Sequence, residues 1–154
     1  MIKKETIIIL TEDDDGHVGL ILYKLKEAGI ANKILHFKSG EETLDFFFKR
    51  GSGPHMEIGV PYLLLLDIRL PGIDGIEVLR RLKEDKWVAK FPIIMTSVID
   101  NPKEIEICRK LGCNNYFVKA PSFEKFAHAI EQLGQYINEV ILPEISSQQK
   151  TSNM

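Results

Sequence analysis

One apolar run and the turn after it constrain the fold of this chain more than any other feature. Residues 62–66 read Tyr-Leu-Leu-Leu-Leu, and Asp67 follows them directly. An unalternating apolar run of this length is typical of a strand covered on both faces, as in a parallel sheet flanked by helices. Pro71-Gly72 and Asp74-Gly75 then indicate a tight loop before an amphipathic helix over residues 76–83. The sequence therefore predicts a strand that ends on a carboxylate, then a loop and a helix.

The same unit of strand and helix recurs along the chain. Strands are predicted over residues 6–11, 32–37, 62–67, 93–97 and 115–119, and helices over 17–28, 39–49, 76–83, 102–111 and 122–137. Because strand and helix alternate five times, the connections are crossovers and the sheet is parallel. We expect an α/β fold of the flavodoxin-like, doubly wound type, with strand order 2-1-3-4-5. Residues 50–61, rich in glycine and proline, are expected to form a surface insertion.

Length and charge limit the classes of protein to which the chain can belong. Its 154 residues suffice for one well-cored domain, predicted over residues 1–142, with a flexible tail over 143–154. The net charge of -2 offers no electrostatic footprint for nucleic acid or an anionic membrane. No apolar run approaches the roughly 18 residues that cross a bilayer. With Cys108 and Cys113 expected as reduced thiols, we predict a cytoplasmic protein.

Polar side chains follow four of the predicted strands. They are Glu12, Asp13 and Asp14 after the first strand, Asp67 after the third, Thr96 and Ser97 at the end of the fourth, and Lys119 after the fifth. In the order 2-1-3-4-5 the first and third strands are neighbours, so their carboxylates are expected close together. Clustered carboxylates repel unless a cation intervenes, and Mg²⁺ prefers oxygen ligands. A lysine and a hydroxyl can hold phosphoryl oxygens, and an aspartate beside such a metal could accept a phosphoryl group.

Each of these residues also has a purely structural interpretation. An acid run such as residues 12–15 is often a solvated helix N-terminus that the helix dipole favours. An aspartate at a strand end often caps the next helix, and an isolated lysine usually lies on the surface. Four independent coincidences at one sheet edge would be needed to explain the whole set, so a joint site is the better interpretation.

The set resembles a response-regulator receiver domain. The resemblance spans residues 6–137 and rests on Glu12-Asp13, the block around Asp67 that ends in Pro71-Gly-Ile-Asp-Gly75, Ser97, Tyr116 and Lys119. It implies that a sensor histidine kinase transfers a phosphoryl group to Asp67. It also implies Mg²⁺ held by Asp13, Asp67 and the backbone carbonyl of Arg69, with Glu12 acting on the metal through water.

The same resemblance assigns the remaining side chains. Ser97 and Lys119 would bind the phosphoryl oxygens, and Tyr116 would be the switch aromatic that turns inward when Ser97 is drawn to the phosphate. Family members place this hydroxyl five residues after the proline that opens strand four and 22 before the lysine. Pro92 and Lys119 therefore both select Ser97 over Thr96.

Two features depart from the pattern or tune it. The family's lysine is normally followed directly by proline, whereas Ala120 stands between Lys119 and Pro121. Arg69 and Ile99 occupy positions that, in the family, modulate attack of water on the phosphate. The resemblance implies a signalling domain, not an enzyme, with slow autodephosphorylation.

A narrower resemblance is to single-domain regulators that serve phytochrome-type histidine kinases. It rests on the insertion before the central strand, on Thr11-Glu12-Asp13-Asp14, and on the ending from Glu124-Lys125-Phe126-Ala127 through Pro143-Glu144. It implies signalling by protein–protein binding, without an output domain. It also favours a homodimer whose seam would be built from residues 140–142 with Phe123, Tyr136 and Ile137, although these residues could instead cover the domain's own core.

Two other classes compete with this interpretation. A haloacid-dehalogenase-like phosphohydrolase uses a similar residue set, but it needs a second acid two residues after its nucleophile, where Arg69 stands. A flavin- or nucleotide-binding module is compatible with the fold. However, no glycine-rich phosphate loop follows the first strand, where four acids would repel a phosphate unless a metal intervened.

Overall fold

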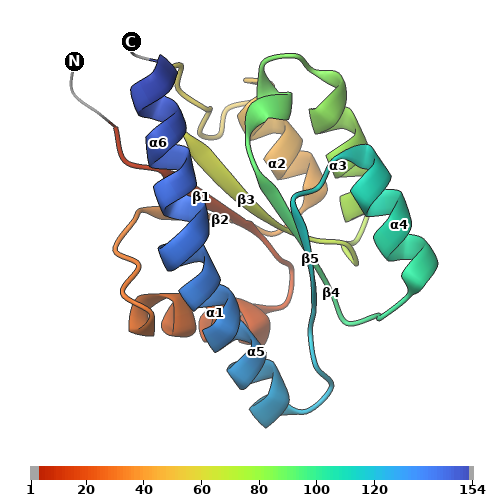
Figure 1. Cartoon of the computed structure of the whole chain (residues 1–154). Helices are drawn as coiled ribbons and strands as arrows, with labels where there is room; N and C mark the ends of the chain where they lie inside the picture. Colours follow the sequence, from red (N-terminus) through yellow and green to blue (C-terminus); the bar gives the residue numbers. More distant parts are fainter. Residues whose placement is uncertain (1–3, 153–154) are drawn as a thin grey trace.

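A five-stranded parallel sheet organises the chain (Figure 1). The computed structural model describes residues 4–152. The strand order is β2-β1-β3-β4-β5, with every neighbouring pair parallel. The strands are β1 (Ile7–Thr11), β2 (Ile34–Phe37), β3 (Tyr62–Asp67), β4 (Ile93–Ser97) and β5 (Asn115–Val118). The predicted flavodoxin-like fold and strand order are confirmed.

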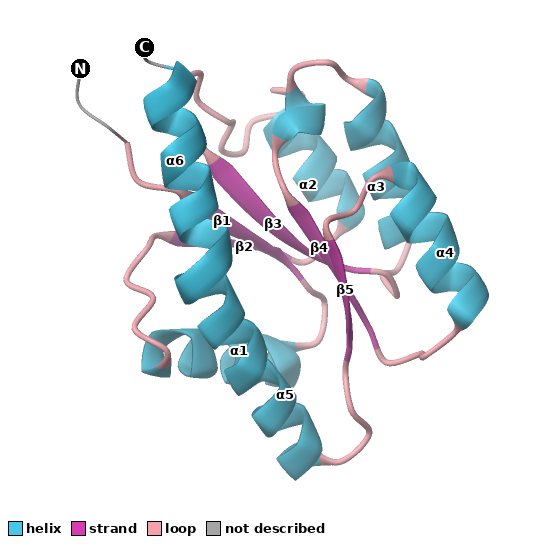
Figure 2. Ribbon diagram, in the orientation of Figure 1, coloured by secondary structure: helices cyan, strands magenta, loops and turns pink. Residues whose placement is uncertain are grey.

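Helices cover both faces of the sheet (Figure 2). One face carries α2 (Gly40–Phe47), α3 (Gly75–Glu84) and α4 (Pro102–Leu111), and the other carries α1 (Asp15–Glu27) and α5 (Phe123–Tyr136). A short 3-10 helix, Val88–Lys90, precedes β4. Among residues 4–152, no helix combines the length and apolar character needed to cross a bilayer.

The central strand β3 belongs to two hydrophobic cores at once. Every residue of β3 is buried. Leu64 and Leu66 join the core under α2, α3 and α4, whereas Leu63 and Leu65 join the core under α1 and α5. Alternate side chains of a strand point to opposite faces, so a strand buried on both faces has to be apolar throughout. This explains the uninterrupted apolar run in the sequence.

The last helix differs from the predicted tail. After α5 the chain continues through a π-helical turn, Ile137–Ile141, into α6 (Leu142–Ser152). Pro143 has no N–H for a regular helical bond, which accounts for the widened turn just before it. The described part of the predicted tail, residues 143–152, is helical, and Ile145 within it is buried against the α1–α5 core. Residues 153 and 154 lie outside the described part.

Part of the expected dimer seam is used within the chain itself. Ile137 and Ile141 are buried in the same core as α1 and α5. These two residues therefore cover the chain's own core, as the alternative interpretation held, and are unavailable to a partner. Phe123 and Tyr136 are exposed on α5.

The insertion at residues 50–61 lies on the surface but is anchored. Residues 50–55 are exposed, whereas Met56 and Val60 are buried in the core under α2 and α3. The backbone N–H of Met56 donates to the carbonyl of Phe46 at 3.0 Å, and the N–H of Glu57 donates to the Tyr62 hydroxyl at 2.9 Å. Two buried apolar side chains thus anchor a loop whose other residues are largely exposed.

Candidate functional site

The loop after Asp67 begins α3 in close contact with the end of β3. Asp74 caps α3 by accepting a hydrogen bond from the Glu77 N–H at 2.9 Å. The N–H of Gly75 donates to the carbonyl of Ile68 at 2.9 Å. A Cβ at position 75 would lie 2.2 Å from the carbonyl oxygen of Asp67, so only glycine fits. The Asp-Gly pair of the sequence therefore positions the backbone that carries Asp67.

Three carboxylates meet at the carboxyl edge of the sheet. Glu12, Asp13 and Asp67 offer oxygens that all lie within 4.8 Å of one another. Glu12 and Asp67 are buried and Asp13 is exposed. The structure brings these three residues together as expected, because β1 and β3 are neighbours that end side by side. Oxygen donors in a group of this kind fit a hard divalent cation such as Mg²⁺.

The four consecutive acids divide between two roles. Glu12 and Asp13 belong to the carboxylate cluster. Asp14 instead caps α1, its side chain accepting a hydrogen bond from the His17 N–H at 3.0 Å. Asp15 begins α1 and pairs with Lys38 at 3.3 Å on the surface. The helix-terminus interpretation of the run therefore holds for Asp14 and Asp15, whereas Glu12 and Asp13 lie in the carboxylate cluster.

Lys119 reaches the cluster from the end of β5. Its Nζ donates to the carboxylate of Glu12 and lies 3.5 Å from Oδ1 of Asp67. Its backbone N–H donates to the carbonyl of Ser97 at 2.7 Å. The ammonium is buried beside the carboxylates, with 2 % of the side chain exposed. Ala120, the departure noted in the sequence, therefore leaves Lys119 at the site.

Burial and Lys119 act differently on the two buried carboxyls. Burial raises the pKa of Asp67 to about 7, and the charge of Glu12 adds to this effect while Lys119 opposes it. Burial also acts to raise the pKa of Glu12, but the hydrogen bond and charge of Lys119 outweigh it, so this pKa is lowered. Lys119 thus offsets the effect of burial at Glu12 but not at Asp67, so the pKa of Asp67 stays raised and its neutral form is favoured.

The hydroxyl residues of β4 end beside Asp67 and Lys119. Thr96 pairs with Asp67 across the β3–β4 ladder, and Ser97 pairs with Val118 across the β4–β5 ladder. Both are buried. The Ser97 hydroxyl accepts a hydrogen bond from the N–H of Ile99 at 3.2 Å, so it is engaged with the backbone of its own loop.

Tyr116 and Arg69 meet a residue that the sequence did not single out. Glu104, in the first turn of α4, binds the Arg69 guanidinium. The hydroxyl of Tyr116 lies 3.2 Å from Oε1 of Glu104 and 3.1 Å from the carbonyl oxygen of Ile99. Burial raises the pKa of Tyr116 to about 12. Tyr116 is half-buried, and its hydroxyl is bonded to the β4–α4 loop and α4.

Two histidines also contact the acidic loop and were missed from sequence. His17 Nδ1 lies 3.2 Å from Nζ of Lys119 and 3.4 Å from Oε1 of Glu12. His36 Nε2 lies 2.7 Å from the backbone carbonyl oxygen of Glu12. The position of His17, in the first turn of the helix after the acids, was the available signal. His36 lies on a different strand and gave none.

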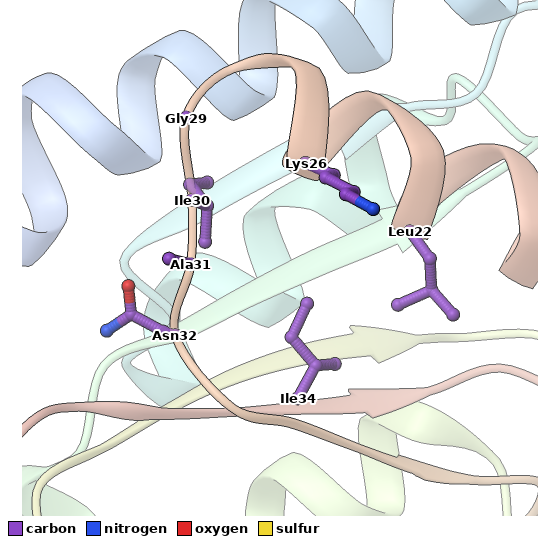
Figure 3. A pocket seen from close by; sticks show the side chains of 7 residues that line it. All are labelled: Leu22, Lys26, Gly29, Ile30, Ala31, Asn32 and Ile34. Atoms are coloured by element: carbon purple, nitrogen blue, oxygen red, sulfur yellow. The ribbon is translucent and has the colours of Figure 1, made fainter.

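A groove elsewhere on the surface has other chemistry. It encloses about 530 Å³ between the end of α1 and β2, and its lining includes Leu22, Ile34 and Lys26 (Figure 3). No carboxylate or hydroxyl side chain lines it. The polar cluster at the sheet edge, not this groove, is the candidate site.

Comparisons with known proteins agree with this geometry. Residues 8–131 match the family described as the response regulator receiver domain. The probable methanogenesis regulatory protein FilR2 of Methanothrix harundinacea is 28% identical over 130 residues, which cover 84% of this chain and 82% of FilR2.

Two solved structures are similar over most of the chain. A response regulator receiver domain from Rhodospirillum rubrum is 34% identical with a TM-score of 0.81, covering 87% of this chain and 94% of that one. The bacteriophytochrome response regulator RtBRR is 29% identical with a TM-score of 0.68, covering 85% and 78%. With the family match spanning most of the sequence, this chain belongs to the response regulator receiver domains of two-component systems.

Proposed function

We propose that the protein accepts a phosphoryl group on Asp67 from a sensor histidine kinase in a Mg²⁺-dependent reaction. The observation that carries this proposal is a buried aspartate at a strand end, next to two other carboxylates and a buried lysine. A carboxylate oxygen of Asp67 would form the new O–P bond as the N–P bond of the kinase phosphohistidine breaks. The kinase histidine is thereby released without its phosphoryl group.

Each site residue has a proposed part in this transfer. Asp13, Asp67 and the backbone carbonyl of Arg69 would hold Mg²⁺, with Glu12 acting through water, and the ion would neutralise charge on the phosphoryl oxygens. Lys119 and Ser97 would bind phosphoryl oxygens. Lys119 already lies between Glu12 and Asp67. Binding the phosphoryl group therefore requires a shift of its hydrogen bonds, not a large movement.

In this proposal the protein is a signalling domain, and its only chemistry is its own phosphorylation and slow dephosphorylation. Arg69 and Ile99 stand at the positions implied to modulate attack of water, and Arg69 is bound to Glu104. We expect the phosphorylated form to persist for longer than minutes. Decay of the phosphorylated mass within minutes in Mg²⁺ buffer would contradict this.

We also propose that the kinase is of the phytochrome type and that the protein is a cytoplasmic homodimer that signals by protein–protein binding. The similarity to RtBRR supports the first point. Phe123 and Tyr136, exposed on α5, support the dimer. Light scattering that finds only monomer at micromolar concentration would remove the dimer.

The haloacid-dehalogenase alternative has no support from the family match. It also lacks its second acid, because Arg69 stands two residues after Asp67 and is paired with Glu104. Turnover of phosphate esters by the purified protein would be needed to revive it.

The decisive experiment is incubation with acetyl phosphate and Mg²⁺, followed by intact mass. One phosphoryl group should be added to the unmodified chain, and none to Asp67→Asn or without metal. Asp14→Asn is the matched control, because Asp14 caps α1 and lies outside the carboxylate cluster. This control should be phosphorylated like the unmodified chain. No adduct on the unmodified chain would overturn the proposal.

A further inference from the structure

Glu104 joins two segments that the sequence separates widely. Its Oε2 binds the guanidinium of Arg69, which follows Asp67 by two residues, and its Oε1 lies 3.2 Å from the hydroxyl of Tyr116 on β5. Glu104 itself lies in the first turn of α4. One carboxylate thus contacts the Asp67 loop, the strand that leads to Lys119, and the start of α4.

Hydrogen-bond counting shows why this contact holds the tyrosine. The Tyr116 hydroxyl has one proton, and its neighbours are the carboxylate of Glu104, the carbonyl of Ile99 and the side chain of Ser97. A charged acceptor binds a hydroxyl more strongly than a neutral one. Only 12 % of the Glu104 side chain is exposed, so water replaces these contacts poorly. Glu104 is therefore the charged partner of the tyrosine hydroxyl on the α4 side, beside the neutral groups of Ile99 and Ser97.

We propose that Glu104 is a positioning residue that holds Arg69 and the Tyr116 hydroxyl on the α4 side, and that it releases them when Asp67 is phosphorylated. This inference rests on the proposed function. A guanidinium binds phosphate oxygens at least as well as a single carboxylate. Added negative charge at Asp67 therefore competes with Glu104 for Arg69, two residues away.

Release has a direct structural consequence. When Arg69 leaves, Glu104 loses the cation that compensates its largely buried carboxylate. The start of α4 then gains freedom to move, and Tyr116 loses the geometry that keeps its hydroxyl in place. Phosphorylation of Asp67 would thus be coupled to the position of Tyr116 and of α4 through one carboxylate.

The first test does not need phosphorylation. NMR of tyrosine-labelled protein, with the Tyr116 signal assigned by its loss in Tyr116→Phe, compares Glu104→Gln and Glu104→Ala with the unmodified chain. The ring signal should shift in both variants, more in Glu104→Ala. Glu106→Gln is the matched control: Glu106 lies on the same helix but pairs with Arg109, so its loss should leave the signal unchanged. An unmoved Tyr116 signal in Glu104→Ala would overturn the proposal.

The second test follows phosphorylation by acetyl phosphate and Mg²⁺. Glu104→Ala should react roughly five- to tenfold faster than the unmodified chain, because no contact has to be released first. Arg69→Ala combined with Glu104→Ala should be no faster than Glu104→Ala alone, since both changes remove one ion pair. Equal rates for Glu104→Ala and Glu106→Gln would overturn the coupling. Lack of phosphorylation in the unmodified chain would overturn the proposed function, while the tyrosine signal still decides the positioning role.

Discussion

Two ion pairs flank Asp67, and they differ in burial. On one side Lys119 binds Glu12, with 2 % of each side chain exposed. On the other side Arg69 binds Glu104, with 47 % and 12 % exposed. The first pair is enclosed by strand ends of the sheet, whereas the second connects a loop to the first turn of a helix. Both are pairs of a cation and a carboxylate, but the first is shielded from water and the second is partly exposed to it.

The difference in burial suggests that the Lys119–Glu12 pair is fixed and that the Arg69–Glu104 pair can be released. Breaking a buried pair leaves an uncompensated charge and is costly, so Lys119 stays in place for any group that arrives at Asp67. In the second pair only the Arg69 guanidinium is half in water, so water compensates Arg69 when it separates and it can be exchanged to a new partner more easily than Lys119 can. Burial, not the type of residue, decides which pair can take part in a switch.

The largest effect is expected from Lys119→Ala. This variant leaves Glu12 and Asp67 buried without a cation, so the free energy of unfolding should fall by about 3–5 kcal/mol in urea denaturation. The matched control is Lys38→Ala, which breaks an exposed pair with Asp15 and should cost less than about 1 kcal/mol. If Lys119→Ala lowers the free energy of unfolding no more than Lys38→Ala does, the Lys119–Glu12 pair is not held in place by its burial.

An effect of intermediate size, and of opposite sign, is expected from Asp67→Asn in metal-free buffer: this variant should be more stable than the unmodified chain. The folded protein raises the pKa of Asp67 from 3.8 to about 7, so it binds more protons than the unfolded chain between these values. Stability of the unmodified protein should therefore fall as pH rises from about 4 to about 7. Asn does not titrate and avoids this loss.

The gain in the free energy of unfolding can be measured by comparing the variant with the unmodified chain at pH 8 and at pH 4. Asp67→Asn should be more stable than the unmodified chain by roughly 2 kcal/mol at pH 8, with about 4 kcal/mol as the upper bound. The two proteins should converge toward pH 4 in urea denaturation. A difference that grows toward low pH would have the wrong sign and would refute the assigned pKa shift.

The smallest effect on stability is expected from Arg69→Ala. Removal of the half-exposed partner of Glu104 should lower the free energy of unfolding by less than about 1 kcal/mol. A fall in the free energy of unfolding as large as that of Lys119→Ala would show that the two ion pairs are equally fixed. The releasable pair proposed for Glu104 would then be excluded.

Local patterns predicted the elements and most of the site. The five strands and the turn before α3 follow from apolar runs and from Asp-Gly punctuation, which act within a few residues. The carboxylate cluster followed from strand order, because parallel strands end at one edge. The helical segment after residue 142 was missed because its composition is polar, and its contacts are made to distant parts of the chain: Ile145 is buried in the α1–α5 core and Gln149 Nε2 donates to the carbonyl of Lys4 at 3.0 Å.

The order of residues is therefore enough to predict which side chains reach the sheet edge, since strand and helix periods are local properties. The partner that each charge takes depends on folding. Glu12 and Lys119 are 107 residues apart, and Arg69 and Glu104 are 35 apart. Burial then divides these pairs, because the solvent around a charge is decided by everything packed against it. A sequence pattern can place Asp67, but only packing shows that the Lys119–Glu12 pair is enclosed whereas the Arg69 guanidinium is half exposed to water.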